Sequence, residues 1–166
     1  MERPPTLKLV DDVSALYEAL RGPLLRFAAV KNLGNTADFE DLVHDAFVEL
    51  YLTRLKGIPI NNPTSWLFKA VDSRGIDKIR KHTRELSHLR SLPEPQSDHP
   101  RGIQDLEYAE LAKQALSQLN SRERQILVMS GDGFTYQEIA DALDTTVSLV
   151  SVYKCRALKK IRTLKP

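Results

Sequence analysis

The chain has 166 residues and a net charge of +2, with 42% apolar and 28% charged residues, which fits one large globular domain or two small ones. A single cysteine, Cys155, cannot form an internal disulfide, and neither a signal-peptide pattern nor a run of about 18 apolar residues is present. These features argue against secretion and membrane insertion, so we expect a cytoplasmic protein.

Three helices are predicted in the first 91 residues. They span about 12–32, 37–56 and 63–91, because apolar residues recur there at three- and four-residue intervals. The third helix has a strong start: the side chain of Asn62 can cap it, and Pro63 fits the first helical position, where no backbone N–H is needed.

A linker is predicted at residues 92–104, which contain three prolines and one glycine and show neither helical nor strand periodicity. It separates a domain at 1–91 from a second domain at 105–166. Helices are expected near 105–118, 121–130, 136–143 and 147–163, and no segment predicts a strand. The fold class is therefore all-α, with two small helical domains joined by a Pro-rich linker.

Two capping boxes are predicted in the second domain, at Asn120–Glu123 and at Thr135–Glu138. The second box opens a helix-turn-helix pattern at 135–158, in which one side of the second helix packs inward and the other is free to enter a DNA major groove. The free side would carry six residues: Ser148, Ser151, Val152, Cys155, Arg156 and Lys159. Lys154, Lys160 and Arg162 would add attraction to phosphate. An ordinary helical hairpin is the alternative.

Charge is unevenly spread along the chain. Residues 63–92 hold seven Lys/Arg against three Asp/Glu, and residues 145–166 hold six basic residues and no acidic one. Two basic blocks suggest two contacts with nucleic acid, although solvated helix faces would look the same. In contrast, Asp41, Asp45 and Glu49 form an acidic ridge on the second helix, either for docking on a basic surface or simply solvated.

Two aromatic residues precede the basic half of the third helix. Trp66 shares an apolar stripe with Ala70 and is expected in the core, as are Leu42 and Phe47 of the second helix. Phe68 lies off that stripe and is the better candidate for stacking on an unpaired base.

The whole chain resembles the extracytoplasmic-function (group IV) sigma factors of the sigma-70 family. Residues 41–51 resemble the region-two helix that docks on the polymerase, 63–80 resemble the helix that binds and opens the minus-ten element, and 119–158 resemble region four, which reads the minus-thirty-five element. This resemblance implies a three-helix region-two bundle, a region-four helix-turn-helix, and an RNA polymerase sigma factor that directs promoter recognition and transcription initiation.

The resemblance, together with the charge pattern, gives three sets of candidate site residues. The core-polymerase set is Asp41, Leu42, Asp45 and Glu49. The minus-ten set is Phe68, Lys69, Arg74, Lys78, Arg80, Lys81 and Arg84. The minus-thirty-five set is Ser148, Ser151, Val152, Lys154, Arg156, Lys159 and Lys160. The implied partners are core RNA polymerase, through its beta-prime clamp helices and beta flap, promoter DNA and an anti-sigma factor.

Some positions depart from the family pattern. Asp72 stands where a basic residue is common and Ser73 where Asn is common, so either Asp72 points away from DNA or the minus-ten element is read differently. The Asn62-Pro63 start and Tyr153 look most similar to the iron-starvation subgroup.

Two alternatives remain on sequence grounds. A free-standing helix-turn-helix regulator of operator DNA explains 119–163 equally well but leaves the acidic second helix and the basic third helix unexplained. A metal hydrolase built on His44 and Asp45 lacks enough converging ligands. No cofactor, metal or catalytic residue is expected, and the chain is not expected to be an enzyme.

Overall fold

The computed structural model describes residues 5–32, 36–88 and 112–163. For residues 5–7, 31, 32, 36–38 and 76–88 only the helical backbone is described. Every regular element within these ranges is an α-helix, as predicted. None of the described helices combines the length and the apolar character that a membrane span needs.

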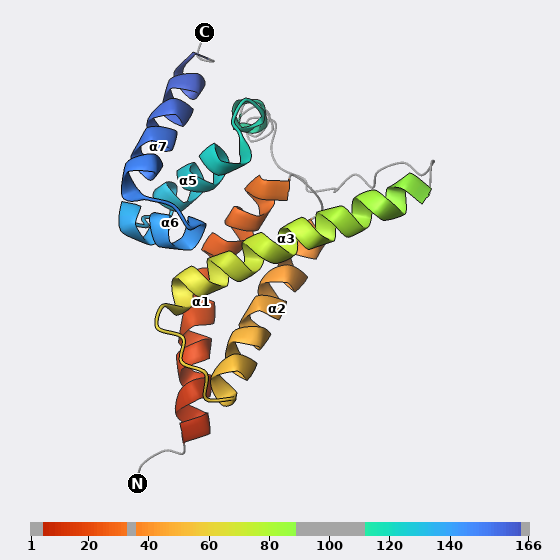
Figure 1. Ribbon diagram of the computed structural model, residues 1–166, viewed down its shortest axis with the longest axis vertical. Helices are drawn as coiled ribbons and strands as arrows, with labels where there is room; N and C mark the ends of the chain where they lie inside the picture. Colours follow the sequence, from red (N-terminus) through yellow and green to blue (C-terminus); the bar gives the residue numbers. More distant parts are fainter. Residues whose placement is uncertain (1–4, 33–35, 89–111, 164–166) are drawn as a thin grey trace, which may run out of the picture.

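The N-terminal part is a bundle of three helices, α1 (Pro5–Asn32), α2 (Thr36–Leu55) and α3 (Pro63–His88), which lie against one another (Figure 1). Helix α1 begins seven residues earlier than predicted and continues through Pro23, although proline removes one backbone hydrogen bond there. The bundle is held by fully buried side chains such as Leu24, Leu50 and Leu67, each worth about 1.5–3 kcal/mol on burial.

The predicted start of α3 is confirmed. The Ser65 backbone N–H donates to Oδ1 of Asn62 at 2.9 Å, so the asparagine satisfies an amide that has no partner inside the helix. Pro63 then occupies the first helical position, where its missing N–H costs nothing.

The C-terminal part contains a helical segment at 112–117 followed by α5 (Ser121–Gly131), α6 (Tyr136–Leu143) and α7 (Val147–Arg162). Both capping boxes are present as predicted, at Asn120–Glu123 and Thr135–Glu138. Residues 105–111 of the predicted first helix and the linker at 92–104 lie outside the described residues.

A tight turn joins α6 to α7. Asp144 adopts the left-handed conformation there, with φ of 53°, a position at which glycine is more common and Asp is tolerated. Thr146 then caps α7 by accepting from the backbone N–H of Leu149, and Arg122 of α5 donates to the carbonyl of Leu143 at the end of α6. These contacts fix the crossing of the two helices.

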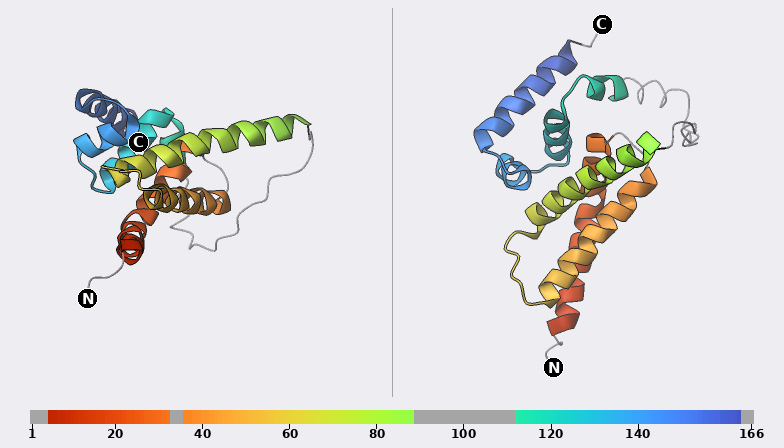
Figure 2. Two further views of the ribbon diagram at one scale, coloured as in Figure 1. Left: turned by 60° about the horizontal axis from the view of Figure 1, so that its bottom comes forward. Right: turned by 45° about the vertical axis from the view of Figure 1, so that its right-hand side comes forward.

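The two parts pack closely together in this structure. Helix α5 lies on α1 and α6 lies on α3, and the buried apolar side chains form one continuous cluster that runs through both parts. Figure 2 shows the C-terminal part from two further directions, with α7 on its outer side, where it packs on α5 and α6. The surface of α3 that faces α6 is therefore interior in this arrangement.

Candidate functional site

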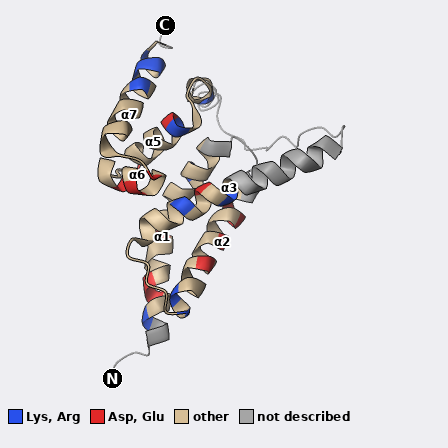
Figure 3. Cartoon of the chain, in the orientation of Figure 1, with Lys and Arg blue, Asp and Glu red and all other residues tan. Residues whose placement is uncertain are grey.

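The acidic ridge on α2 is exposed. Asp41, Asp45 and Glu49 all lie on the solvent side of the helix, and Figure 3 shows acidic residues recurring along it. Leu42, in contrast, is 2% exposed within the bundle core, as its apolar stripe predicts, so its side chain is not available for the contact with polymerase that was also expected of it. The burial of Phe47 is as predicted.

One member of the ridge is already paired. Glu49 forms an ion pair with Arg74 of α3, and both side chains remain partly exposed. No ion-pair or hydrogen-bond partner is assigned to the carboxylates of Asp41 and Asp45 among the contacts of the described residues. The free negative charge of the ridge is thus concentrated in its first two members.

Phe68 is fully buried, which contradicts its expected role as an exposed stacking residue. Its ring makes edge contacts with Phe27 of α1 and with Phe134 of the α5–α6 turn, at centroid distances of 5.0 and 5.2 Å. Phe68 shares the buried stripe of α3 with Leu67 and Val71, so the stripe through Trp66 and Ala70 was the wrong choice of core-facing side. Trp66 is partly buried against the core.

The described basic residues of the minus-ten set are engaged within the molecule. Lys69 lies 3.5 Å from a carboxylate oxygen of Asp144, and Arg74 pairs with Glu49. The side chains of the other four members fall outside the described residues, on the second half of α3: Lys78, Arg80, Lys81 and Arg84.

The side chain of Asp72 is engaged by α5. Its Oδ1 accepts a hydrogen bond of 2.6 Å from the side-chain amide of Gln125 on α5, which is 3% exposed. Asp72, which stands where the family commonly has a basic residue, thus has a hydrogen-bond partner in the second half of the chain.

The two sides of α7 divide as predicted. Val150 and Ala157 are fully buried and Tyr153 is half-buried, facing the buried Ile139 and Leu143 of α6. The opposite side is exposed along its whole length and consists of Ser148, Ser151, Val152, Cys155, Arg156 and Lys159. With no acidic side chain on α7, this surface can approach a phosphate backbone without repulsion from its own helix.

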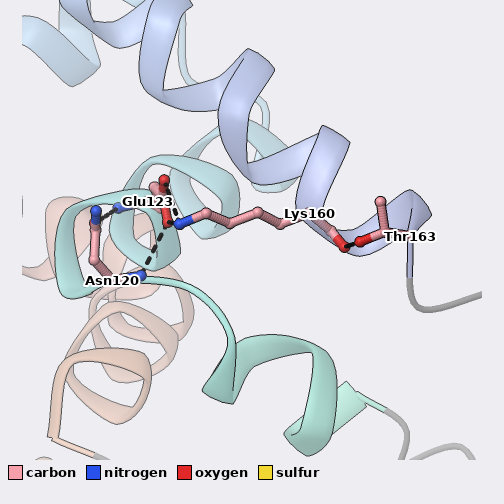
Figure 4. Close-up of polar contacts among 4 residues, drawn as sticks. All are labelled: Asn120, Glu123, Lys160 and Thr163. Carbon is pink, nitrogen blue, oxygen red and sulfur yellow. Dashed lines mark hydrogen bonds and ion pairs between the residues drawn. The ribbon is translucent and has the colours of Figure 1, made fainter.

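Lys160 has a different role from the one predicted. Its ammonium group contacts both carboxylate oxygens of Glu123, at 3.0 and 2.8 Å, and Glu123 is 2% exposed (Figure 4). Burial by itself raises the pKa of Glu123, but hydrogen bonds from Lys160 and the Asn120 backbone, together with the charges of Lys160 and Arg156, lower the pKa below its ordinary value. Lys160 therefore ties α7 to α5 and is not free for phosphate.

Lys154 is also partly engaged. Its ammonium lies 5.0 Å from the ring centroid of Tyr136 on α6, a cation–π contact. Cys155 is exposed on the outer side of α7 and is a free thiol.

Several residues at the junction of the two halves had no sequence signal. Arg26 of α1 reaches Asp132 after α5, with 2.8 Å from its Nε to Oδ1, and Gln125 and Phe134 meet α3. None of these residues belongs to a motif, and only the folded structure brings them together.

No group of three or more potential metal ligands occurs among the described residues. His44, the centre of the metal-hydrolase alternative, is exposed on α2 beside the ridge. The arrangement of the described side chains thus offers charged surfaces for binding.

Two family models match the chain. The model "Sigma-70 region 2" matches residues 16–85, and the model "Sigma-70, region 4" matches residues 109–161. These ranges correspond to the α1–α3 bundle and to the helix-turn-helix part, in the predicted order.

Two curated relatives are similar over most of the chain. The ferric citrate uptake sigma factor FecI of Escherichia coli is 27% identical over 88% of this chain and 88% of its own length. The ECF RNA polymerase sigma factor SigJ of Mycobacterium tuberculosis is 28% identical over 87% of this chain, which spans 48% of that longer protein.

Two solved structures share the fold. The sigma factor RpoE from Bartonella quintana, in complex with the anti-sigma factor NepR, matches with a TM-score of 0.70 and 23% identity over 93% of this chain and 96% of its own. CnrH, in complex with the cytosolic domain of CnrY, matches with a TM-score of 0.60 and 24% identity over 92% of this chain and 86% of its own. Both family matches, the relatives and the fold agree: the chain belongs to the sigma-70 family and is an RNA polymerase sigma factor of the extracytoplasmic-function type.

Proposed function

We propose that this sigma factor uses three separate surfaces to bind core RNA polymerase and the two promoter elements. The acidic ridge of α2 binds core RNA polymerase, the basic second half of α3 holds the minus-ten region, and the outer side of α7 reads the minus-thirty-five element. The observation that carries the proposal is the outer side of α7, where six exposed side chains include two cations and no acid.

The chemistry of α7 fits a major groove. Ser148 and Ser151 can donate to or accept from base edges, Arg156 can pair with guanine or phosphate, and Val152 offers an apolar surface to a thymine methyl group. Lys159 and Arg162 contribute attraction that is independent of sequence. Lys160 is left out of this set because Glu123 holds its charge.

The ridge of α2 has the opposite character. Asp41 and Asp45 are exposed one helical turn apart, and their charges can complement a basic surface of the polymerase, such as its clamp helices. The beta flap is the proposed contact of region four.

The chain itself performs no covalent step in this proposal. Polymerase carries out RNA synthesis, and the sigma factor supplies binding energy. Promoter opening is favoured because the protein binds the unpaired strand better than the duplex, which shifts the equilibrium toward the melted state. This work takes place where the polymerase is, so we infer a cytoplasmic protein.

An anti-sigma factor is a further proposed partner. Of the two solved structures that share the fold, RpoE was solved in complex with the anti-sigma factor NepR. CnrH was solved in complex with the cytosolic domain of CnrY. The similarity to FecI, with Asn62-Pro63 and Tyr153, also supports placing the chain near the iron-starvation subgroup.

Retention on purified core RNA polymerase tests the docking surface. The full chain should be retained stoichiometrically, and Asp41→Lys/Asp45→Lys should abolish retention. The matched control is Asp12→Lys/Glu18→Lys, which makes the same charge change at exposed positions of α1 and should be retained like the wild type. Equal loss in both variants would show a general charge effect and contradict docking through α2.

The free-standing regulator gives a different result. A regulator would shift duplex DNA tightly on its own and would not need polymerase, whereas a sigma factor acts on promoter DNA within the holoenzyme. If the wild-type chain is not retained on core polymerase but binds duplex DNA without it, the proposed roles of the three surfaces are refuted.

A further inference from the structure

The outer side of α2 carries an apolar stripe as well as the acidic ridge. Val48, Leu52 and Leu55 are 43%, 48% and 43% exposed. Helices α1 and α3 pack on the opposite side of α2, where Leu42 and Leu50 are buried. The second half of α2 is therefore apolar on both sides, and a contiguous row of exposed apolar side chains marks an interaction surface more often than scattered single ones do.

The spacing of the stripe is that of a seam between two helices. Intervals of four, three, four and three residues separate five positions of α2: Asp41, Asp45, Val48, Leu52 and Leu55. At 3.6 residues per turn, all five lie within about 40° of one line along the helix. The first part of this seam is acidic and the second part is apolar.

A second copy of α2 fits the apolar part of the seam in one orientation. Parallel pairing would place the carboxylates of Asp41 and Asp45 from both copies side by side, which is unfavourable. Antiparallel pairing, with Leu52 of each copy beside Leu55 of the other, brings the apolar parts together. It leaves both carboxylates of each chain beyond the apolar overlap.

Charges beside the seam favour this register. In antiparallel helices, residues on the same edge of the seam meet each other, and Glu49 and Lys56 are exposed on one edge of α2. Lys56 continues the helical turn, because its backbone N–H donates to the carbonyl of Leu52 at 3.2 Å. With Leu52 beside Leu55 of the second copy, Glu49 lies within about 3 Å of the level of Lys56 of that copy. Two opposite-charge pairs can then form, one at each end of the overlap.

The neighbouring register is unfavourable. A shift of one heptad, with Leu52 beside Val48 of the second copy, would bring the two Glu49 carboxylates together. It would also place Asp45 against Leu55. The pair of Glu49 with Arg74 in its own chain does not prevent the favoured register, because a carboxylate has two oxygens and accepts from more than one cation.

We propose that α2 is also a self-association surface, through which two free chains pair with their α2 helices antiparallel. An overlap of two to three turns buries only about 1,000 Å² in total, which is near the lower limit of specific interfaces, so the dimer is weak and forms at micromolar concentrations or above. The same seam contains Asp41 and Asp45, so a second copy and core polymerase exclude each other from α2. This exclusion rests on the polymerase docking proposed above, whereas the pairing itself does not.

Sedimentation velocity of the free full-length chain, from micromolar concentrations upward, tests the pairing. We expect a reversible change from monomer to dimer. Leu52→Glu should weaken the dimer at least about tenfold, because it places a carboxylate against Leu55 of the second copy. The matched control is Leu149→Glu, the same change at an exposed position of α7, which should associate like the wild type. A wild-type chain that stays monomeric at every concentration, or equal effects of the two variants, would overturn the proposal.

A charge swap tests the register. Lys56→Glu should weaken the dimer, and adding Glu49→Lys in the same chain should restore it, because the two opposite-charge pairs form again with their signs exchanged. Circular dichroism shows whether each variant keeps its helices, since the swap also removes the pair with Arg74. A folded double variant that associates no better than Lys56→Glu would overturn this register.

Crosslinking tests the orientation. Leu52→Cys and Asp41→Cys, each in a Cys155→Ser background, are treated with a short bismaleimide. In the antiparallel pair the two positions 52 lie about 10 Å apart, whereas the two positions 41 are separated by more than about 30 Å along the helix axis. Only Leu52→Cys should give a covalent dimer, and equal crosslinking of Asp41→Cys would overturn the antiparallel arrangement.

The stoichiometry on core polymerase tests the exclusion. At concentrations at which the free wild-type chain is dimeric, one chain should be retained for each polymerase. Two chains for each polymerase would overturn the exclusion. If no chain is retained, the polymerase docking fails and the exclusion fails with it, while sedimentation still decides whether α2 pairs with itself.

Discussion

The ion pair between Lys160 and Glu123 gives a sharp test of how α7 is held. Replacing Lys160 by Met removes contacts of 3.0 and 2.8 Å from a carboxylate that is 2% exposed. Breaking a buried pair typically costs 3–5 kcal/mol, but Lys160 is 45% exposed and water can replace part of its effect, so we expect about 2–3 kcal/mol.

Replacing the acid instead of the base should cost less. In Glu123→Gln the amide oxygen can still accept from the Asn120 backbone N–H, now 3.0 Å from Glu123 Oε2, and no charge is left buried. We expect a loss of about 1 kcal/mol, the net worth of an ordinary hydrogen bond. The double variant should resemble Glu123→Gln, because Lys160 matters chiefly through the buried carboxylate.

Thermal unfolding followed by circular dichroism measures these differences, and each kcal/mol corresponds to a shift in Tm of about 2–4 °C for a chain of this size. The control is Lys159→Met, which removes an exposed neighbouring cation and should change stability by less than about 0.5 kcal/mol. A Lys160→Met variant as stable as this control, or more stable than Glu123→Gln, would refute the reasoning.

The same pair predicts a dependence on pH. Because the folded pKa of Glu123 is lowered from 4.5, its contribution to stability is present above pH 4.5 and is lost as pH falls through the lower folded value. Glu123→Gln lacks this loss, so its deficit relative to the wild type should shrink below pH 4.5. Equal deficits at pH 7 and pH 3 would contradict the assignment.

Three further changes test the turn, the caps and the DNA surface. Asp144→Gly should raise Tm by about 2 °C, because glycine adopts the φ of 53° without strain. The ion pair with Lys69 that is lost is exposed and contributes little; a lower Tm would mean that this pair stabilises the fold by more than the strain of Asp144 destabilises it. Thr135→Ala should cost about 1 kcal/mol in denaturant unfolding, because the N–H of Glu138 loses its cap; no change would show that water replaces it. Arg156→Ala should weaken promoter binding by the holoenzyme, lowering the slope against log salt by about 1 if it contacts phosphate; an unchanged affinity would remove it from the interface.

Local features of this fold were predictable from sequence. Asn62, Asn120 and Thr135 cap helices as expected, because a cap depends only on residues within one turn. The two sides of α7 were also predictable, since the spacing of Val150 and Ala157 defines the buried stripe.

The errors lie where distant segments meet. Phe68 lies on the buried stripe of α3 with Leu67 and Val71, and its ring is enclosed by Phe27 of α1 and by Phe134 of the second half of the chain. Lys160 stays partly exposed, and its ammonium pairs with the buried carboxylate of Glu123. Periodicity describes one helix against a generic core and contains no information about which partner from another domain will cover its remaining side. Asp72 and Gln125, 53 positions apart, illustrate the same point.

The caps around the helix-turn-helix have a consequence for how the protein can vary. The box at Asn120–Glu123, the box at Thr135–Glu138 and the bond from Arg122 to Leu143 all close within the second half of the chain. These hydrogen bonds therefore do not depend on the contacts that the second half makes with α1 and α3. Substitutions at the junction with α1 and α3 leave these hydrogen bonds in place, so the junction can vary in sequence without changing how the helix-turn-helix is capped.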